Sequence, residues 1–119
     1  MEIEFPKRGQ IWVLRLDPTV GAEIKKTRPA LIISNDICNK YTATVTVLPI
    51  TSQASGVQPF EVSLSPPEGG LLKDSKIKSQ QIRTVDKSRL VKLIGAISQE
   101  KLRQTEQALL IHLDIQVFR

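Results

Sequence analysis

The sequence predicts a mainly β domain, a small and strongly bent sheet or barrel closed by one C-terminal helix. Three observations predict this class. Most of the chain alternates between apolar and polar residues or forms short β-branched runs, which are typical of strands. Long polar loops separate these runs, and helical periodicity appears only after residue 98.

Composition is that of one globular domain, 1–119, with 40% hydrophobic and 24% charged residues. No apolar run approaches the roughly 20 residues of a membrane helix. The opening "MEIEFPKRGQ" lacks a secretory signal, so we expect a cytoplasmic protein with no membrane association. One cysteine and one histidine exclude an intrachain disulfide and a structural zinc site. The cysteine, Cys38, lies in "NDICNKY", which is expected to be a turn with Cys38 partly buried. The net charge of +5 favours an anionic partner.

Periodicity and turn residues place the elements along the chain. In the segment 75–85, Ile77 and Ile82 are candidate core residues. Asp86 is the expected N-cap of a short helical turn, and Gly95 predicts a bulge or a close backbone contact. The predicted strands are 9–17, 29–35, 43–50, 60–64, 75–85 and 90–97.

The last segment, 98–115, predicts the helix. Ser98 is a good N-cap, and Glu100 suits the first turn. One face is expected to pack on the sheet; it contains Leu102, Thr105, Ala108, Leu109 and Leu113. Because aromatic content is only 4%, the core must be mostly aliphatic, and dimerisation would stabilise so small a domain.

The sequence contains no Walker loop, no paired Cys-x-x-Cys, no histidine cluster and no serine elbow. His112, the only histidine, is expected to be structural or exposed. An enzyme of this composition must work by positioning and electrostatic stabilisation. Cleavage of RNA suits such a site, because the 2′-hydroxyl of the substrate can attack its own phosphate.

Two residues could stabilise that reaction. In "IKKTRPALIISND", Pro29 holds Arg28 in an extended conformation at the start of a strand, and a guanidinium pairs well with phosphate. Thr51 ends "VTVLPIT" and could add a hydrogen bond. The alternatives are a surface arginine beside a proline and a threonine that makes a local turn hydrogen bond.

The segment "SKIKSQQIRTVDKSR" carries a second group of basic residues. They form either a solvated face or a stripe that follows phosphates, while the amides of Gln80 and Gln81 could read unpaired bases. The basic residues are Lys76, Lys78, Arg83, Lys87 and Arg89.

Taken together, several stretches resemble the MazF/PemK family of toxin endoribonucleases, in family order from Lys7 to Leu113. They are "RGQIWVLRLDPTVGAE", "TRPALIISND", "VLPITS", "EGGLLKDS", "QIRTVDKSRLVKLIGAIS" and a helix ending in "ALLIHL". The resemblance implies an SH3-like β-barrel with a C-terminal helix, of the CcdB/MazF type, that forms a symmetric homodimer. It also implies a MazE-like antitoxin that binds through an acidic, flexible segment.

The implied activity is sequence-specific cleavage of single-stranded RNA, chiefly messenger RNA, without metal or other cofactor. The products would be a 2′,3′-cyclic phosphate and a 5′-hydroxyl. Arg28 of the "RPA" motif and Thr51 after "PI" match the family's catalytic positions. The residues implied to touch RNA are Glu23, Ser52, Gln53, Ser75 and Gln81.

The loop 18–27 departs from many family members, since it has no glycine after Gly21. We expect a stiffer loop, in which Lys25 and Lys26 add affinity for phosphate. Two other functions remain open. A CcdB-like toxin would bind DNA gyrase and cut nothing, and a non-catalytic barrel would bind RNA without cleaving it; the pair Arg28 and Thr51 favours cleavage.

Overall fold

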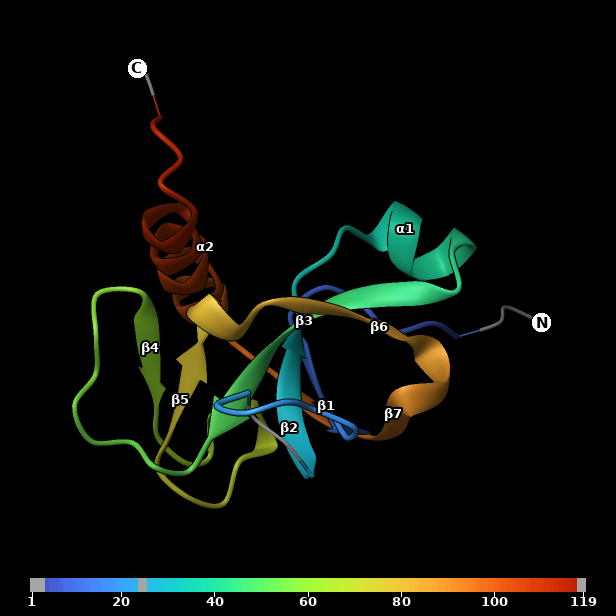
Figure 1. Cartoon of the computed structure of the whole chain (residues 1–119), viewed down its shortest axis with the longest axis horizontal. Coiled ribbons are helices and arrows are strands. Elements are labelled where there is room, and N and C mark those ends of the chain that lie inside the picture. The colour runs from blue at the N-terminus through green and yellow to red at the C-terminus, as the bar shows by residue number, and fades with distance from the viewer. Residues whose placement is uncertain (1–3, 24–25, 118–119) are drawn as a thin grey trace.

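A computed structural model describes residues 4–23 and 26–117. The strands are β1 (Gln10–Arg15), β2 (Thr27–Ile32), β3 (Thr44–Thr51), β4 (Glu61–Leu64), β5 (Ser75–Lys78), β6 (Arg83–Asp86) and β7 (Leu90–Ala96). The helices are α1 (Asp36–Tyr41) and α2 (Gln99–Leu113), with short 3-10 turns η1 (Glu68–Gly70), η2 (Ser79–Gln81) and η3 (Lys87–Arg89). A mainly antiparallel sheet with a C-terminal helix is therefore confirmed (Figure 1).

The sheet is antiparallel throughout and has seven strands, in the order β4-β5-β3-β2-β1-β7, with β6 paired to β3. β3 is the central strand, because it pairs with β2 and, over successive parts of its length, with β6 and β5. Figure 1 shows β2 and β3 crossing in the middle of the molecule, with α2 beside β4 and β5. Both ends of β3 are therefore held by neighbouring strands.

Each face of the sheet has its own hydrophobic core. Alternation along β2 divides its side chains, since Leu31 and Ile33 enter one core and Ala30 and Ile32 enter the other. The first core also contains Ile11, Leu48, Ile50, Val62, Leu64, Leu71, Ile77, Ile97 and Ala108. The second contains Leu14, Leu16, Val45, Val47 and Val85. β2 and β3 are thus buried on both faces, which fixes the strand ends that carry the site.

Helix α2 begins as predicted. Ser98 is its N-cap, and the Ser98 hydroxyl accepts a hydrogen bond from the Lys101 amide at 3.2 Å. Thr105 and Ala108 are buried against the sheet. The prediction for Leu113 is wrong: it is 45% exposed, because the end of α2 extends beyond the sheet (Figure 1).

The predicted strand 75–85 is wrong as one element, since η2 divides it into β5 and β6. These two strands pair with Ile50–Thr51 and Thr44–Val47 of β3, so the break falls opposite Leu48 and Pro49. Pro49 has no N–H to donate to a partner strand, which interrupts the ladder there. Ile77 is fully buried as predicted.

Two smaller predictions are confirmed, and one expectation is not. The Asp86 carboxylate accepts a bond from the Ser88 amide at 2.8 Å; bonds from Ser88 lower the pKa of Asp86. A Cβ added at Gly95 would lie 2.4 Å from the carbonyl oxygen of Gly69, so this backbone contact requires glycine. Cys38 lies in α1 and is exposed, whereas its segment was expected to be a turn.

Candidate nucleic-acid interface

Arg28 and Thr51 lie at neighbouring ends of β2 and β3. The two strands pair Ala30 with Pro49, the last pair of their ladder, and this register continued by two residues would set Arg28 opposite Thr51. On its other side, Arg28 is paired with Leu14 of β1, and Thr51 is paired with Lys76 of β5. The fold therefore brings the two predicted catalytic residues to the same end of two adjacent central strands.

Arg28 is half-buried and lines a pocket of about 320 Å³, which we name the Arg28 pocket. Its walls are mostly apolar and come from β1, β2, β3, β5, β7 and the segment that begins at the end of η1. Ser52 and Ser75, both predicted to touch RNA, also line it, and Lys73 adds a second basic side chain. The lining residues are Val13, Arg28, Pro29, Ile50, Ser52, Gly70, Leu71, Leu72, Lys73, Ser75 and Ile94.

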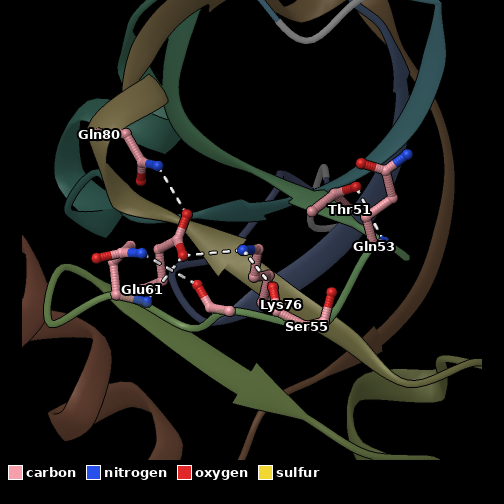
Figure 2. A network of polar contacts seen from close by, with 8 residues as sticks. Thr51, Gln53, Ser55, Glu61, Lys76 and Gln80 are labelled. Carbon is pink, nitrogen blue, oxygen red and sulfur yellow. Dashed lines mark hydrogen bonds and ion pairs between the residues drawn. The ribbon is translucent and has the colours of Figure 1, made fainter.

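The hydroxyl of Thr51 accepts a hydrogen bond from the backbone amide of Gln53 at 3.2 Å (Figure 2). This is the local turn contact that the sequence raised as the alternative role. The contact orients the hydroxyl, and because the oxygen is the acceptor, the O–H proton remains able to be donated to a second group. A turn contact and a catalytic contact are therefore compatible at Thr51.

Glu23 and Gln81 line a second pocket of about 430 Å³, between the β1–β2 loop and η2. We name it the Gln81 pocket; it is lined by Val20, Ala22, Glu23, Gln80, Gln81, Ile82 and Arg83. The Gln81 amide donates to the Ala22 carbonyl at 3.2 Å, and the Glu23 carboxylate accepts from the Val20 amide at 3.1 Å. Glu23 and Gln81 are 58 residues apart in the sequence, and both are predicted to touch RNA. The fold thus brings them into one pocket.

Two arginines of the predicted basic stretch hold the start of the same loop. Arg83 donates to the Leu16 carbonyl at 3.2 Å, while Arg89 donates to the carbonyls of Arg15 and Asp17 at 3.1 and 2.6 Å. Their guanidinium groups donate to backbone carbonyls, so these two arginines are not a purely solvated face. Together with Gln81, they fix the β1–β2 loop against η2, β6 and η3.

Lys76 differs even more from both expectations, because it is buried. Its ammonium group lies 3.0 Å from a carboxylate oxygen of Glu61, and the two residues are 8% and 7% exposed. Burial raises the pKa of Glu61, but hydrogen bonds from Gln80, Gln58 and Lys76 outweigh it and hold that pKa below its ordinary value. Local pattern could not predict this pair, because Glu61 is identified only as part of a strand.

The remaining predicted residues are less constrained. Ser52 and Gln53 are exposed in the loop after β3, and Lys26 is exposed at the end of the β1–β2 loop. Ser75 is only 5% exposed, and its hydroxyl donates to the Lys73 carbonyl at 2.9 Å. Lys25 lies outside the described residues.

The described residues contain neither a cluster of metal ligands nor a membrane-spanning helix. No group of three or more His, Cys, Asp or Glu residues is placed to hold a metal ion. No helix in residues 4–23 and 26–117 is long and apolar enough to cross a membrane.

Comparison with known proteins identifies the family of the chain. The model of PemK-like, MazF-like toxins of type II toxin–antitoxin systems matches residues 7–113. Endoribonuclease MazF9 of Mycobacterium tuberculosis (strain ATCC 25618 / H37Rv) is 43% identical over 115 residues, which cover 92% of this chain and 97% of MazF9.

Solved structures share the fold. MazF (Form-I) from Deinococcus radiodurans has 27% identity and a TM-score of 0.84, covering 95% of this chain and 100% of that one. MazE-MazF (Form-II) from the same organism has 25% identity and a TM-score of 0.74, covering 96% and 100%. The chain therefore belongs to the PemK-like, MazF-like toxins of type II toxin–antitoxin systems, as an endoribonuclease of the MazF family.

Proposed function

We propose that this toxin cleaves single-stranded RNA, chiefly messenger RNA, at a short base sequence and without a metal cofactor. The 2′-oxygen attacks the adjacent phosphorus, and the bond from phosphorus to the 5′-oxygen breaks. The 2′-hydroxyl loses one proton and the leaving 5′-oxygen gains one, so the step consumes no water. The products are a 2′,3′-cyclic phosphate and a 5′-hydroxyl.

In this proposal Arg28 neutralises the charge that develops on the phosphate oxygens, and Thr51 donates a hydrogen bond to the same group. A guanidinium remains protonated at ordinary pH, so Arg28 acts as a cation and donor rather than as a general base. The observation that carries the proposal is the β2–β3 register, which ends with Ala30 opposite Pro49 and leaves Arg28 and Thr51 two residues farther along, at neighbouring ends of the two strands. Both strands are buried on two faces, which supports a fixed geometry.

RNA would then extend from the Arg28 pocket toward the Gln81 pocket. Ser52, Gln53 and Ser75 belong to the first part of this path, and Glu23 and Gln81 to the second. Lys25 and Lys26 in the β1–β2 loop would contact phosphates. Because the Gln81 side-chain amide already donates to the Ala22 carbonyl, a contact with a base would either use the other hydrogen-bonding groups of the amide or replace this bond.

The test incubates the purified protein with a long single-stranded RNA in EDTA and maps the new 5′ ends. We expect cuts at one short sequence. The new 5′ ends should accept phosphate from polynucleotide kinase without prior phosphatase treatment, because they carry hydroxyl groups. A substrate with 2′-deoxyribose at the cut position should remain intact.

Intact RNA at high protein concentration would contradict the proposal. If the same protein then inhibited supercoiling by DNA gyrase, the CcdB-like function would replace it. Binding of RNA without any cleavage would support the non-catalytic barrel. Equal cleavage of the 2′-deoxy substrate would retain the nuclease but exclude attack by the 2′-oxygen.

The family relationship further supports a homodimer and a MazE-like antitoxin with an acidic, flexible segment. Large apolar side chains are exposed on α1, β7 and α2, and their burial would stabilise a dimer. They include Ile37, Tyr41, Val91, Leu93, Ile111 and Leu113. Sedimentation of the purified toxin should give twice the chain mass of 13.3 kDa, and a monomer at all concentrations would contradict the dimer.

A further inference from the structure

The buried ion pair of Glu61 and Lys76 lies directly beside the candidate catalytic threonine. Lys76 is the cross-strand partner of Thr51, and residues directly opposite each other share one face of a sheet. The opposite face at this position carries Ile50 and Ile77, which belong to the hydrophobic core. The ion pair therefore occupies the face from which Thr51 projects, and it is not part of the core.

The loop that follows Thr51 is attached to this pair at two points (Figure 2). The Lys76 ammonium donates to the Ser55 carbonyl at 3.1 Å. The Gln58 amide donates to the Glu61 carboxylate at 3.0 Å. The loop carries Ser52 and Gln53, both assigned to RNA contact, so the ion pair holds the backbone that presents them.

The same carboxylate reaches a third segment. The other oxygen of Glu61 accepts a hydrogen bond from the Gln80 side-chain amide at 2.7 Å. Gln80 lies in η2 next to Gln81, which lines the second pocket. One carboxylate thus connects the loop after Thr51 with the turn that carries Gln81, as Figure 2 shows for Gln80 and the ion pair.

Stability alone does not account for this arrangement. A buried ion pair is weak evidence for stability, because an apolar pair of similar volume often stabilises a fold as well or better. Among the described residues, the side-chain oxygen of Gln80 and the hydroxyl of Ser79 are buried without a hydrogen-bond partner, which is a cost to the same turn. The hydrogen bonds of Glu61 and Lys76 instead attach two segments, the loop after Thr51 and η2, in a defined orientation.

We propose that Glu61 and Lys76 are positioning residues, which hold the loop 52–60 and the turn η2 in one fixed relation and so determine which RNA sequence is cut. This inference rests on the proposed nuclease function. Neither residue contacts the reacting atoms. The pair acts through Ser52 and Gln53 on one side and through Gln81 on the other.

The test compares Lys76→Met, Glu61→Leu and the double variant with wild type. Each single variant leaves one buried charge without its partner and should lower the melting temperature, whereas the double variant should recover most of the loss. The double variant still lacks both loop attachments. Its amides in the segment 53–58 should exchange hydrogen faster, its KM should rise, and kcat/KM should fall on the order of 10- to 10²-fold.

The decisive measurement is the distribution of cut sites on a long transcript, which a role in stability alone would not change. We expect the double variant to cut additional sequences. Arg8→Met with Glu106→Leu is the matched control, because it removes another ion pair, at 2.9 Å, away from both pockets named above. This control should retain the wild-type sites and the wild-type exchange of the loop.

Gln80→Leu provides a second variant should the charge variants fail to fold. It removes only the attachment of η2, and we expect broader cut sites with little change in melting temperature. A stable double variant, or Gln80→Leu, that kept the wild-type sites and KM would overturn the inference. An inactive wild-type protein would instead overturn the proposed function, and the inference with it.

Discussion

The two ends of β3 border pockets of different size and chemistry. The pocket beside α1 has a volume of about 670 Å³, while the Arg28 pocket has about 320 Å³. In the larger one, Arg8 is already bound to Glu106 at 2.9 Å and to the Ile33 carbonyl at 3.0 Å. The Arg28 pocket combines two basic side chains with an apolar floor, and no acidic residue is among its described lining. The Arg28 pocket is therefore the one that suits a polyanion, because of its basic side chains and its position rather than its volume.

The strongest test of this contrast removes one arginine at each end. Arg28→Ala should lower kcat/KM for RNA by on the order of 10² or more, because it deletes the main donor to the phosphate in the transition state. The melting temperature should change little, since Arg28 is only half-buried. Arg8→Ala is the control and should leave cleavage unchanged. Equal losses of kcat/KM in Arg28→Ala and Arg8→Ala would contradict the proposed difference between the two ends of β3.

A second test compares two threonines of the same strand. Thr51→Val keeps the shape and removes the hydroxyl, and we expect a fall in kcat of roughly 10- to 10²-fold, as one hydrogen bond to a charged group contributes about 1.5–3 kcal/mol. Thr46→Val removes the bond of 2.9 Å to Thr84 at the other end and should not affect cleavage. The rate of RNA cleavage under single-turnover conditions is measured for both variants. A Thr51→Val enzyme with the wild-type rate would remove Thr51 from the site.

The third test concerns phosphate binding. Lys26→Ala should reduce the slope of log K against log salt for binding of single-stranded RNA by about 0.7, the value for one lost contact. Lys40→Ala on α1 removes an exposed lysine near the larger pocket and should leave the slope unchanged. Binding is measured with an RNA that carries 2′-deoxyribose at the cut position. An unchanged slope for Lys26→Ala would place that lysine outside the path of the RNA.

The smallest expected effect is on acid stability. The pKa of Glu61 lies below its ordinary value of 4.5, so the unfolded chain binds more protons at this group than the native one. The carboxylate therefore stabilises the fold above pH 4.5 and loses that contribution as pH falls through its native pKa. Glu61→Gln should unfold more easily than wild type at pH 7, and the difference should shrink in acid.

Glu106→Gln is the comparison for this last test. The Glu106 side chain is 42% exposed, so solvent screens its ion pair with Arg8. Urea unfolding from pH 7 down to about pH 3 should show a smaller loss for Glu106→Gln than for Glu61→Gln at neutral pH. A constant difference across the whole range would show that Glu61 does not contribute through its charge.

Local pattern was sufficient to predict most of the fold. β-branched and alternating residues identified β1, β2, β3, β4 and β7, and Ser98 identified the start of α2. The split of 75–85 was not predictable from its own residues, because its cause lies at Pro49 in another strand. The exposure of Leu113 likewise depends on where the sheet ends, which helical periodicity does not contain.

The candidate site, like the fold, could be predicted from the sequence only in part. Arg28 and Thr51 were identified from the motifs around them, and the register of β2 and β3 agrees with a common site. Two roles were left open for the basic residues of the segment 75–89, and neither included the contacts that three of them make. Arg83 and Arg89 donate to carbonyls, and Lys76 pairs with Glu61, 15 residues earlier. Sequence shows that a charge exists, but its partner depends on tertiary structure.

The way in which the β1–β2 loop is attached affects which amino-acid substitutions the loop can accept. Arg83, Arg89 and Gln81 all bind carbonyl oxygens of the loop, which every amino acid supplies. Side chains at positions such as Thr19 and Val20 can therefore be exchanged while these anchors persist. Homologues could therefore change the RNA sequence that they recognise through substitutions in this loop alone, while the rest of the fold stays the same. A library randomised at these loop positions would sample new recognition specificities.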